Sequence, residues 1–467
     1  MLFHHLRDEG PDAYLIRTLL QFERGEDMAA FVAGLQSMVD RHDILRTSVH
    51  WQGLREPLQL VHRGARLPVE AVTPPPGTTA TQALMQASDP SRVRLDLTRP
   101  PLLRVWTAFD EASGTWLLAI LNHHIVSDHV SLELVLAQVA AQMRADRADV
   151  VPAAPYREFI ESVAASSEAA HAAYFSALLA TVDEITAPFG VATVADGVIG
   201  ASNGTRRVEA ALAARLRDCA REAGVSAAAV FHLAWALALG AASGRSDVVF
   251  GTVLSGRLHN ASLAATPGVF INTLPMRVDL DAASALAALR ALHEQLGALL
   301  EHEHASLALA QRCSGLGAGA APFAALINYR HSAGLLAGIE DAGEGGEVDG
   351  AFGMRLLVSD EHTHYPLALS VDDYGAGFAL KVHCAKGIES EAALERIEHA
   401  VRVLVGALEA ETSGATAMAP SALPTLSASE RKRLTADWNA TDHAYPCEVM
   451  HAGFERQVLE RPQALAV

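Results

Sequence analysis

Residues 116–143 join a strand pattern directly to a helix pattern across a turn that is rich in ionisable groups. The run WLLAIL carries no charge, as in a buried strand, and LELVLAQVAAQM places apolar residues at helical spacing. Between the two runs lies NHHIVSDHVS. A buried strand that leads into a helix is typical of α/β proteins, so this stretch favours an α/β fold with polar groups at a strand end.

The alternation of helix and strand patterns continues through most of the chain. Helical spacing from Asp27 onward precedes the strand-like RTSVHW, and further strand patterns follow at 102–110 and 115–124. A second alternating region follows the proline-containing connection ATVDEITAPFG. Its expected strands are DVVFGTVLSG, FINTLPMRVDL, FAALINYR, PLALSVDDY and GFALKVHC. We therefore predict two α/β halves, residues 1–180 and 181–413, followed by a segment rich in Ala, Ser and Pro.

Composition excludes several classes of protein. Half of the residues are hydrophobic and 19% are charged, which is typical of a globular chain. The 36 basic and 54 acidic residues give a net charge of −18, which argues against a surface that follows nucleic-acid phosphates. The N-terminus shows no secretory signal, and the apolar run from Val225 is expected to be a buried helix rather than a membrane span. Four cysteines without a CxxC pair favour a reducing cytoplasm; they are Cys219, Cys313, Cys384 and Cys447.

The histidines at 123 and 124 have three alternative interpretations. Their spacing with Asp128 and His129 matches neither the helical pair nor the CxxC pattern of zinc sites, so we expect no metal. A histidine held in one tautomer suits general-base chemistry at neutral pH. Alternatively, one histidine is a buried core residue and Asp128 caps the following helix. Because adjacent side chains on a strand point to opposite faces, we expect only one of the two histidines to face a cleft.

The stretch resembles the HHxxxDG signature of nonribosomal peptide synthetase condensation domains, relatives of chloramphenicol acetyltransferase-like acyltransferases. Other segments resemble family motifs in the family's order: RHDILRT at 41–47, PYREFI at 155–160, PGVFINTLPMR at 267–277, INYRHS at 327–332 and YPLALSVDD at 365–373. The resemblance covers residues 1 to about 410. Residues 414–467 are similar to the linker and opening of an adenylation domain.

The resemblance implies a fold and a reaction. The fold would be two chloramphenicol acetyltransferase-like subdomains in a V-shaped arrangement, with the active site at their junction. The reaction would form an amide between an upstream acyl or peptidyl thioester and a downstream aminoacyl amine. Both substrates would arrive on 4'-phosphopantetheine arms of peptidyl carrier proteins, with no cofactor bound directly. The expected partners are those carriers and the adjoining adenylation domain, with no nucleic acid or membrane, and the excised chain is expected to be monomeric.

The resemblance also assigns the site residues. His124, the second histidine of the motif, would accept a proton from the amine or hold it for attack, with His123 as its buried neighbour. Asp128 would pair with an arginine, and the candidates are Arg277, Arg41 and Arg46. The residues expected to support the structure or line the substrate tunnel are Arg277, Arg41, Arg46, His129, Ser131 and Asn272.

Two departures from the family pattern matter, and the first of them leaves the subtype open. His129 stands where the family usually has Gly, and only the end of the family's first motif is present, so His4 and His5 are expected to be an exposed or packed remnant rather than ligands. Combined epimerisation and condensation, starter acylation and side-chain modification therefore remain alternatives. A non-catalytic platform that docks carriers is a further alternative from a different class.

Overall fold

The structure is a computed structural model of the chain. It describes residues 1–7, 12, 14–143, 154–193, 202–257, 263–317, 322–331, 354–360, 363, 365–442, 449 and 451–465. The chain separates into two compact units, residues 1–425 and 426–467.

Helices and strands alternate along the chain as predicted. The helices are α1 (Leu2–Arg7), α2 (Gly25–Arg41), α3 (Ala80–Ala87), α4 (His129–Met143), α5 (Arg157–Ala164), α6 (Glu168–Leu179), α7 (Ala210–Ala223), α8 (Ala227–Ser243), α9 (Ala285–Glu301), α10 (Leu307–Arg312), α12 (Ser390–Thr412), α13 (Ala428–Lys432) and α14 (Ala452–Glu460). The strands are β1 (Leu15–Phe22), β2 (Thr47–His50), β3 (Leu58–Val61), β4 (Val69–Ala71), β5 (Leu103–Asp110), β6 (Thr115–His123), β7 (Ser202–Arg207), β8 (Asp247–Ser255), β9 (Ile271–Asp279), β10 (Ala325–His331), β11 (Met354–Asp360), β12 (Leu367–Asp373) and β13 (Phe378–Cys384). The sequence patterns did not indicate β1, β3, β4, β7 or β11. Short turns of helix lie at η1 (Asp43–Arg46), η3 (Pro188–Gly190), η5 (Pro420–Ala422) and η6 (Arg433–Asp437).

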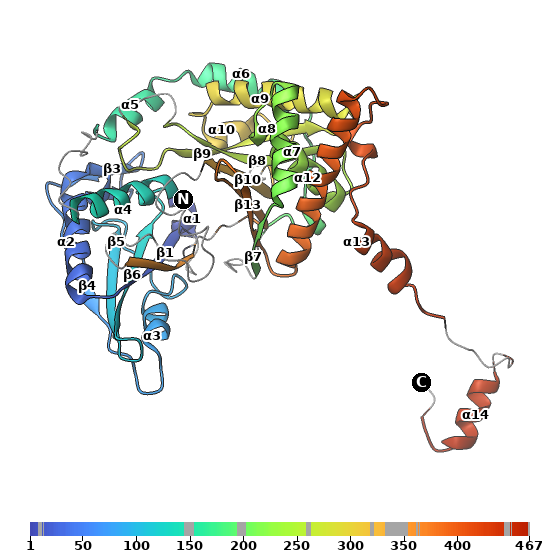
Figure 1. The fold of residues 1–467 in the computed structure, drawn as a ribbon, viewed down its shortest axis with the longest axis horizontal. Coiled ribbons are helices and arrows are strands. Elements are labelled where there is room, and N and C mark those ends of the chain that lie inside the picture. The colour runs from blue at the N-terminus through green and yellow to red at the C-terminus, as the bar shows by residue number, and fades with distance from the viewer. Residues whose placement is uncertain are drawn as a thin grey trace. The chain divides into compact units, whose positions relative to one another are not determined.

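The first sheet has five strands in the order β11-β1-β6-β5-β4 (Figure 1). β1 pairs antiparallel with β6 on one side and with β11 on the other, and β5 pairs antiparallel with β6. β11 comes from residues 354–360, far beyond the first 180 residues. The division of the sequence at residue 180 therefore does not separate the two sheets, because a later strand joins the first one.

The central strand β6 is buried on both faces, as its uncharged sequence predicts. Leu118 and Ile120 belong to the hydrophobic core that includes residues of α2 and α4. Leu117, Ala119 and Leu121 belong to the core on the opposite face, which includes residues of α3. Side chains alternate along a strand, so His123, at the end of β6, continues the series on the α3 face.

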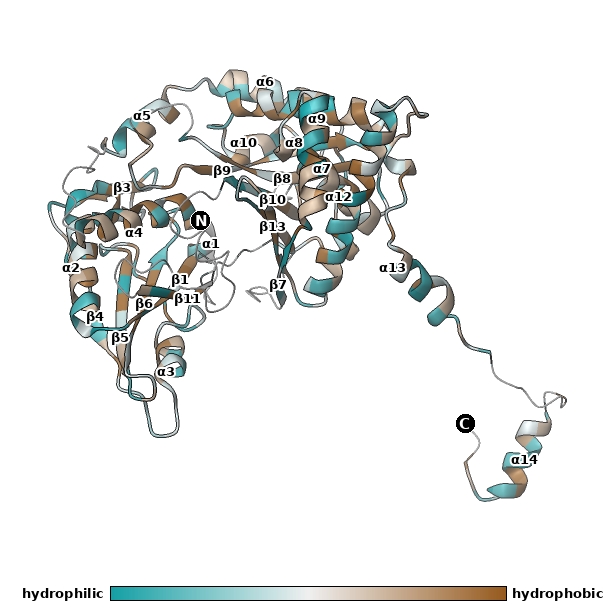
Figure 2. Cartoon of the chain, in the orientation of Figure 1, coloured by the Kyte–Doolittle hydropathy of each residue, from teal (hydrophilic) through white to brown (hydrophobic). Residues whose placement is uncertain are grey.

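The second sheet has six strands in the order β7-β13-β12-β10-β8-β9, with β10 parallel to β8 and β12. Helices α7, α8 and α12 lie along one face of this sheet (Figure 1). Hydrophobic residues are concentrated on its strands and inner helices (Figure 2), and they form one core around Trp235 and Phe250.

Helix α8 is buried along most of its length, between α12, α9 and the sheet. Among the described residues, no single helix is both long and apolar enough to cross a membrane. α7 and α8 meet that criterion only as a pair, and they are bent by 108° relative to each other.

One histidine of α8 is held neutral inside this core. The Nδ1–H of His232 donates to the carbonyl oxygen of Ala228 at 2.7 Å, and its Nε2 accepts from the hydroxyl of Thr252 at 2.7 Å. Burial lowers the pKa of His232 from 6.5 to about 4, with only the Ala228 carbonyl opposing the shift. Protonation would therefore put a buried positive charge on the ring and a proton on Nε2, which already accepts the hydroxyl proton of Thr252.

The unit 426–467 contains α13, η6 and α14. Ser427 is the N-cap of α13, and its hydroxyl accepts the N–H of Glu430 at 3.1 Å. Apolar side chains of α14 are exposed, with Phe454 and Leu459 the largest of them.

We expect folding to weaken as the pH falls from about 6.5 to about 4, because unfolded His232 binds a proton over that range and folded His232 does not. Over the whole range the free energy of unfolding should fall by about 3 kcal/mol, the equivalent of this change in pKa. Urea unfolding at a series of pH values should show a shallower pH dependence in His232→Gln than in the unaltered chain. The exposed His451→Gln is the control and should keep the original slope. Equal slopes in all three proteins would contradict the assignment.

Candidate active site

The histidine pair lies where β6 ends and the turn to α4 begins. His123 is the last residue of the strand and is fully buried, whereas His124 starts the turn and retains 7% of its surface. The backbone N–H of His124 donates to the carbonyl of Tyr14 at 2.7 Å, which extends the pairing of β1 with β6 by one residue. As expected for adjacent residues at a strand end, the two imidazoles have different environments.

Both ring nitrogens of His123 have partners, and these partners determine its tautomer. Nδ1 accepts the backbone N–H of Ile125 at 3.0 Å, so Nδ1 carries no proton. Nε2 lies 3.2 Å from Oδ2 of Asp12 and therefore donates its proton to that carboxylate. Burial lowers the pKa of His123, although Asp12 opposes the shift, so the ring is neutral at neutral pH. His123 is thus a structural member of the pair.

Asp12 connects His123 to the beginning of the chain. Its Oδ2 also accepts from Nδ1 of His5 at 2.6 Å, and its Oδ1 accepts the backbone N–H of Tyr14 at 3.0 Å. Burial works against ionisation, but the hydrogen bonds from His123 and His5 prevail and the pKa of Asp12 lies well below its usual range. His5 is accordingly a buried, hydrogen-bonded residue, the packed one of the two positions, exposed or packed, that the sequence left open.

His5, Asp12 and His123 form a group of three potential metal ligands among the described residues. Their hydrogen bonds do not fit a metal ion. Because the Ile125 N–H occupies Nδ1 of His123, coordination through Nε2 would leave that ring with no proton, as an imidazolate. Neutral imidazole is the usual ligand form of histidine, so this donor set favours the hydrogen-bonded arrangement.

Asp128 ends the turn and caps α4. Its Oδ1 accepts the backbone N–H of Ser131 at 2.8 Å. This bond satisfies one of the N–H groups in the first helical turn that have no acceptor within the helix. Its Oδ2 accepts the backbone N–H of Phe270 at 3.0 Å, from the segment just before β9. The carboxylate, 1% exposed, therefore links the turn of the first sheet to the second sheet.

The arginine that pairs with Asp128 is Arg257, so our choice of Arg277, Arg41 and Arg46 as candidate partners was wrong. Nη2 of Arg257 lies 3.1 Å from Oδ1 of Asp128, and the guanidinium is nearly as buried as the carboxylate. Burial lowers the pKa of Arg257 while Asp128 opposes this, and a guanidinium stays charged in either case. Arg257 lies two residues beyond the end of β8, and its side chain reaches the residue that precedes α4.

Arg257 also holds the chain segment that leads into β9. Its Nη1 donates to the carbonyl of Thr266 at 2.5 Å and reaches that of Leu263 at 3.5 Å. Its Cζ lies 4.0 Å from the ring centroid of Phe270, a cation–π distance.

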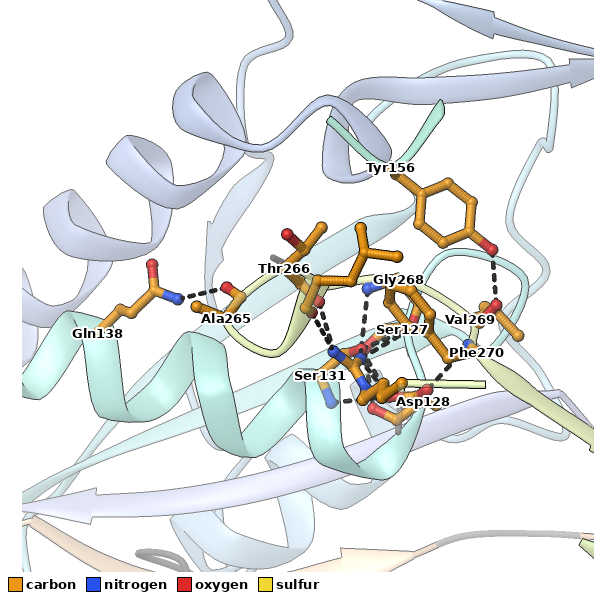
Figure 3. A network of polar contacts seen from close by, with 12 residues as sticks. Ser127, Asp128, Ser131, Gln138, Tyr156, Ala265, Thr266, Gly268, Val269 and Phe270 are labelled. Atoms are coloured by element: carbon orange, nitrogen blue, oxygen red, sulfur yellow. Dashed lines mark hydrogen bonds and ion pairs between the residues drawn. The ribbon is translucent and has the colours of Figure 1, made fainter. Parts of the chain in front are cut away.

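Ser131 stands at the centre of the same network (Figure 3). Its hydroxyl accepts from the backbone N–H of Gly268 at 2.9 Å and from Arg257 at 2.6 Å. Its single proton has two acceptors within reach, Asp128 Oδ1 at 2.6 Å and the carbonyl of Gly268 at 2.5 Å. The sequence predicted a structural or tunnel role for Ser131, and these contacts place it in the structure of the turn.

Residues on both sides of this network hold the same segment (Figure 3). Gln138 of α4 donates to the carbonyl of Ala265 at 3.3 Å, and the Tyr156 hydroxyl donates to that of Val269 at 2.6 Å. Gly268 allows the close approach, because a Cβ there would lie 2.3 Å from the Tyr156 ring. The PYREFI and PGVFINTLPMR motifs, separated by more than 100 residues, thus meet beside Asp128.

The other proposed site residues have separate contacts. Arg46 binds Asp43 and the carbonyl of His62, and Arg277 forms a two-point ion pair with Asp247 at 2.9 and 2.8 Å. The amide of Asn272 donates to the carbonyls of residues 303 and 305, at 2.7 Å each, and so orders the turn between α9 and α10.

Arg41 and His129 lie nearer the turn. Arg41 ends α2 and lines a cavity of about 180 Å³ together with His42, Tyr156 and Pro267. His129 is the first residue of α4, and its Nε2 lies 3.7 Å from Oε1 of Glu133, one helical turn further on.

We expect Arg257→Ala to destabilise the first unit by roughly 3–5 kcal/mol, because it leaves the charge of Asp128 buried without its counter-charge. Arg277→Ala is the matched control, and its partly exposed ion pair should be worth roughly 1 kcal/mol or less. Urea unfolding measures both. Adding Asp128→Asn to Arg257→Ala should recover part of the loss, since the amide carries no charge. Similar losses for the two arginine variants would rule out Arg257 as the essential partner.

Comparisons with known proteins find a matching family model, related sequences and similar folds. The family model of the condensation domain matches residues 1–423. Malpinin synthetase of Mortierella alpina is 38% identical over 471 residues, which cover all of this chain and 6% of that protein. Malpibaldin synthetase of the same organism is 38% identical over 477 residues, again with 100% of this chain and 8% of the relative. The chain thus spans less than a tenth of the length of these relatives.

Among solved structures, the first condensation domain of the calcium-dependent antibiotic synthetase, in complex with a substrate analogue, has a TM-score of 0.69 at 17% identity. The match covers 91% of this chain and 96% of that one. This similarity shows the fold alone, and it confirms the mixed α/β architecture with two chloramphenicol acetyltransferase-like lobes that the sequence predicted. The chain belongs to the condensation-domain family of the nonribosomal peptide synthetases, acyltransferases that form amide bonds, as its motifs indicated.

Proposed function

We propose that the chain joins an upstream acyl or peptidyl thioester to a downstream aminoacyl amine and that His124 handles the proton of the attacking amine. The observation that carries this assignment is that the other two polar residues of the motif, His123 and Asp128, are held by structural hydrogen bonds. Both nitrogens of His123 are bound to Ile125 and Asp12, and Asp128 is bound to Arg257 and the start of α4. His124 follows the first of these two fixed residues and precedes the second in the same turn.

The proposed reaction needs few groups from the protein. The amine nitrogen attacks the thioester carbonyl, a C–N bond forms, the C–S bond breaks, and the thiol of the donor arm leaves with a proton. Presentation of both substrates on tethered arms removes much of the entropic barrier. A general base then needs to supply only about 10²- to 10⁴-fold. A histidine with limited exposure, on a turn held by backbone hydrogen bonds, suits that task.

The proposed partners follow from the same assignment. The donor and acceptor would be carried on phosphopantetheine arms of peptidyl carrier proteins, and no cofactor would bind the chain directly. We assign residues 1–180 and 181–413 mainly to the two lobes, with β11 of the second joining the first sheet, and residues 414–467 to the linker and start of an adenylation domain. Three described cysteines, Cys219, Cys313 and Cys384, are free thiols, which fits the proposed cytoplasmic location.

Because His129 leaves the subtype open, the chemical identity of the product must decide it. The family usually has Gly at this position, and the imidazole here lies at the start of α4, beside Asp128. A plain condensation gives a product whose mass is the sum of the acyl and aminoacyl parts. A product lighter by one water would instead identify a modifying variant, and amide formation only after inversion of the donor would identify combined epimerisation.

We expect His124→Ala to lower amide formation by roughly 10²- to 10⁴-fold, the usual contribution of a general base. A single-turnover assay with a donor-loaded and an acceptor-loaded carrier, read by intact-protein mass spectrometry, measures transfer of the donor mass. His399→Ala is the control, since that histidine lies on α12 and bonds only the carbonyl of Pro424 among the described contacts. Normal turnover in folded His124→Ala would exclude the proton-handling role. Carrier binding without transfer across many substrate pairs would favour a docking platform.

A further inference from the structure

Asp12 lies outside the HHxxxD motif, yet its carboxylate organises the motif's first histidine. Three N–H groups converge on it: Nε2 of His123 at 3.2 Å, Nδ1 of His5 at 2.6 Å and the backbone N–H of Tyr14 at 3.0 Å. The side chains of His5, Asp12 and His123 are all buried. A carboxylate can only accept hydrogen bonds, so each of the three partners must donate.

The orientation of the His123 ring decides the shape of the turn that carries His124. The ring accepts the N–H of Ile125 at its Nδ1, at 3.0 Å. The backbone carbonyl of His123 accepts the N–H of Val126 at 3.1 Å. These two bonds close the turn around His124, whose own N–H is fixed on Tyr14. The backbone position of His124 therefore depends on a ring that offers an unprotonated Nδ1.

We propose that Asp12 is a positioning residue for amide formation: by accepting the Nε2 proton of His123, it keeps Nδ1 free of a proton and thereby fixes the turn that carries His124. This inference rests on the proposed role of His124. It adds to the motif a residue from the beginning of the chain, together with His5, which orients the Asp12 carboxylate from α1.

The opposite tautomer is excluded by its contacts. A proton on Nδ1 would face the N–H of Ile125, so a donor would face a donor. The unprotonated Nε2 would face the Asp12 carboxylate, so an acceptor would face an acceptor, both inside the protein. An unsatisfied buried polar group costs about 1–3 kcal/mol. Asp12 contributes to this preference because it lacks a proton, and its low pKa keeps it so.

Asp12→Asn is the informative variant, because it keeps the shape of the side chain and changes only its hydrogen-bonding character. The amide offers one oxygen where the carboxylate offers two. If that oxygen stays with Tyr14, the NH₂ group faces His123 and drives its proton to Nδ1. We expect the rate of transfer at saturating carriers to fall about 10²-fold, the size of effect that a 1 Å displacement of a reacting group produces. The half-saturating carrier concentrations should stay unchanged.

The experiment combines this kinetic measurement with nitrogen-15 NMR of the full chain labelled at histidine, in which His123→Asn assigns the His123 signals. In the unaltered protein, the proposal requires His123 to carry its proton on Nε2. In Asp12→Asn it requires signals of a protonated Nδ1, together with the slower transfer. Ser88→Ala serves as control, because Ser88 is buried at the end of α3 and bonds only the Leu84 carbonyl among the described contacts. It should change neither readout.

Each result has one meaning. A proton on Nδ1 of His123 in the unaltered chain overturns the proposal, whether or not the variants fold. So does a folded Asp12→Asn protein with the normal transfer rate, or one with a lower rate and unchanged His123 signals. Failure of the proposed function is distinct from these results, because it appears as normal turnover in His124→Ala or as no transfer by the unaltered chain, while the NMR result stands by itself.

Discussion

The ion pair of the buried Asp128 carboxylate with Arg257 is the interaction on which the turn after β6 and the segment that leads into β9 both depend. Asp128 ends the turn after β6, caps α4 and pairs with Arg257, which follows β8. An isolated charge at 1% exposure would be strongly unfavourable, so the ion pair and the surrounding N–H donors are needed together. The result is that neither sheet can shift at this point without separating a buried charge from its partner.

The two ends of the turn are held by different kinds of contact. The Asp128 end is fixed by a charged pair that involves a segment of the second sheet. The His123 end is fixed within the first sheet, by a neutral ring between Ile125 and Asp12. His124 lies between these anchors, so its backbone position is set from both directions, as the proposed role of its side chain requires.

The sequence predicted the strand before the histidine pair and the buried helix of the second half, but it did not predict β1 and β11. The uncharged run before His123 indicated a strand buried on both faces, and the structure confirms this for β6. The apolar run that begins at Val225 was predicted to be a buried helix, and α8 is one. Both predictions succeed because strand burial and helix spacing are properties of short contiguous segments.

The sequence did not predict the long-range partners. Arg257 is 129 residues from Asp128, and only the three-dimensional contact of the segment after β8 with the start of α4 selects it over Arg41, Arg46 and Arg277. Its one local signal was its position as the first charged residue after a buried strand. Asp12 lies in a short polar stretch without periodicity, so no pattern distinguished it from its acidic neighbours.

The pairing of β11 with β1 has a consequence for the synthesis of the protein. β1 ends at residue 22, and β11, its partner on one edge, begins at residue 354. On the order of 300 further residues must therefore be synthesised before this edge of β1 can pair. At the usual rate of translation this corresponds to roughly tens of seconds. During that time LIRTLLQF presents an apolar, unpaired strand edge, the kind of surface on which nascent chains associate. Ribosome-bound chains of this protein are therefore most exposed to aggregation before residue 360 emerges, and a fragment that stops near residue 180 would keep that edge open permanently.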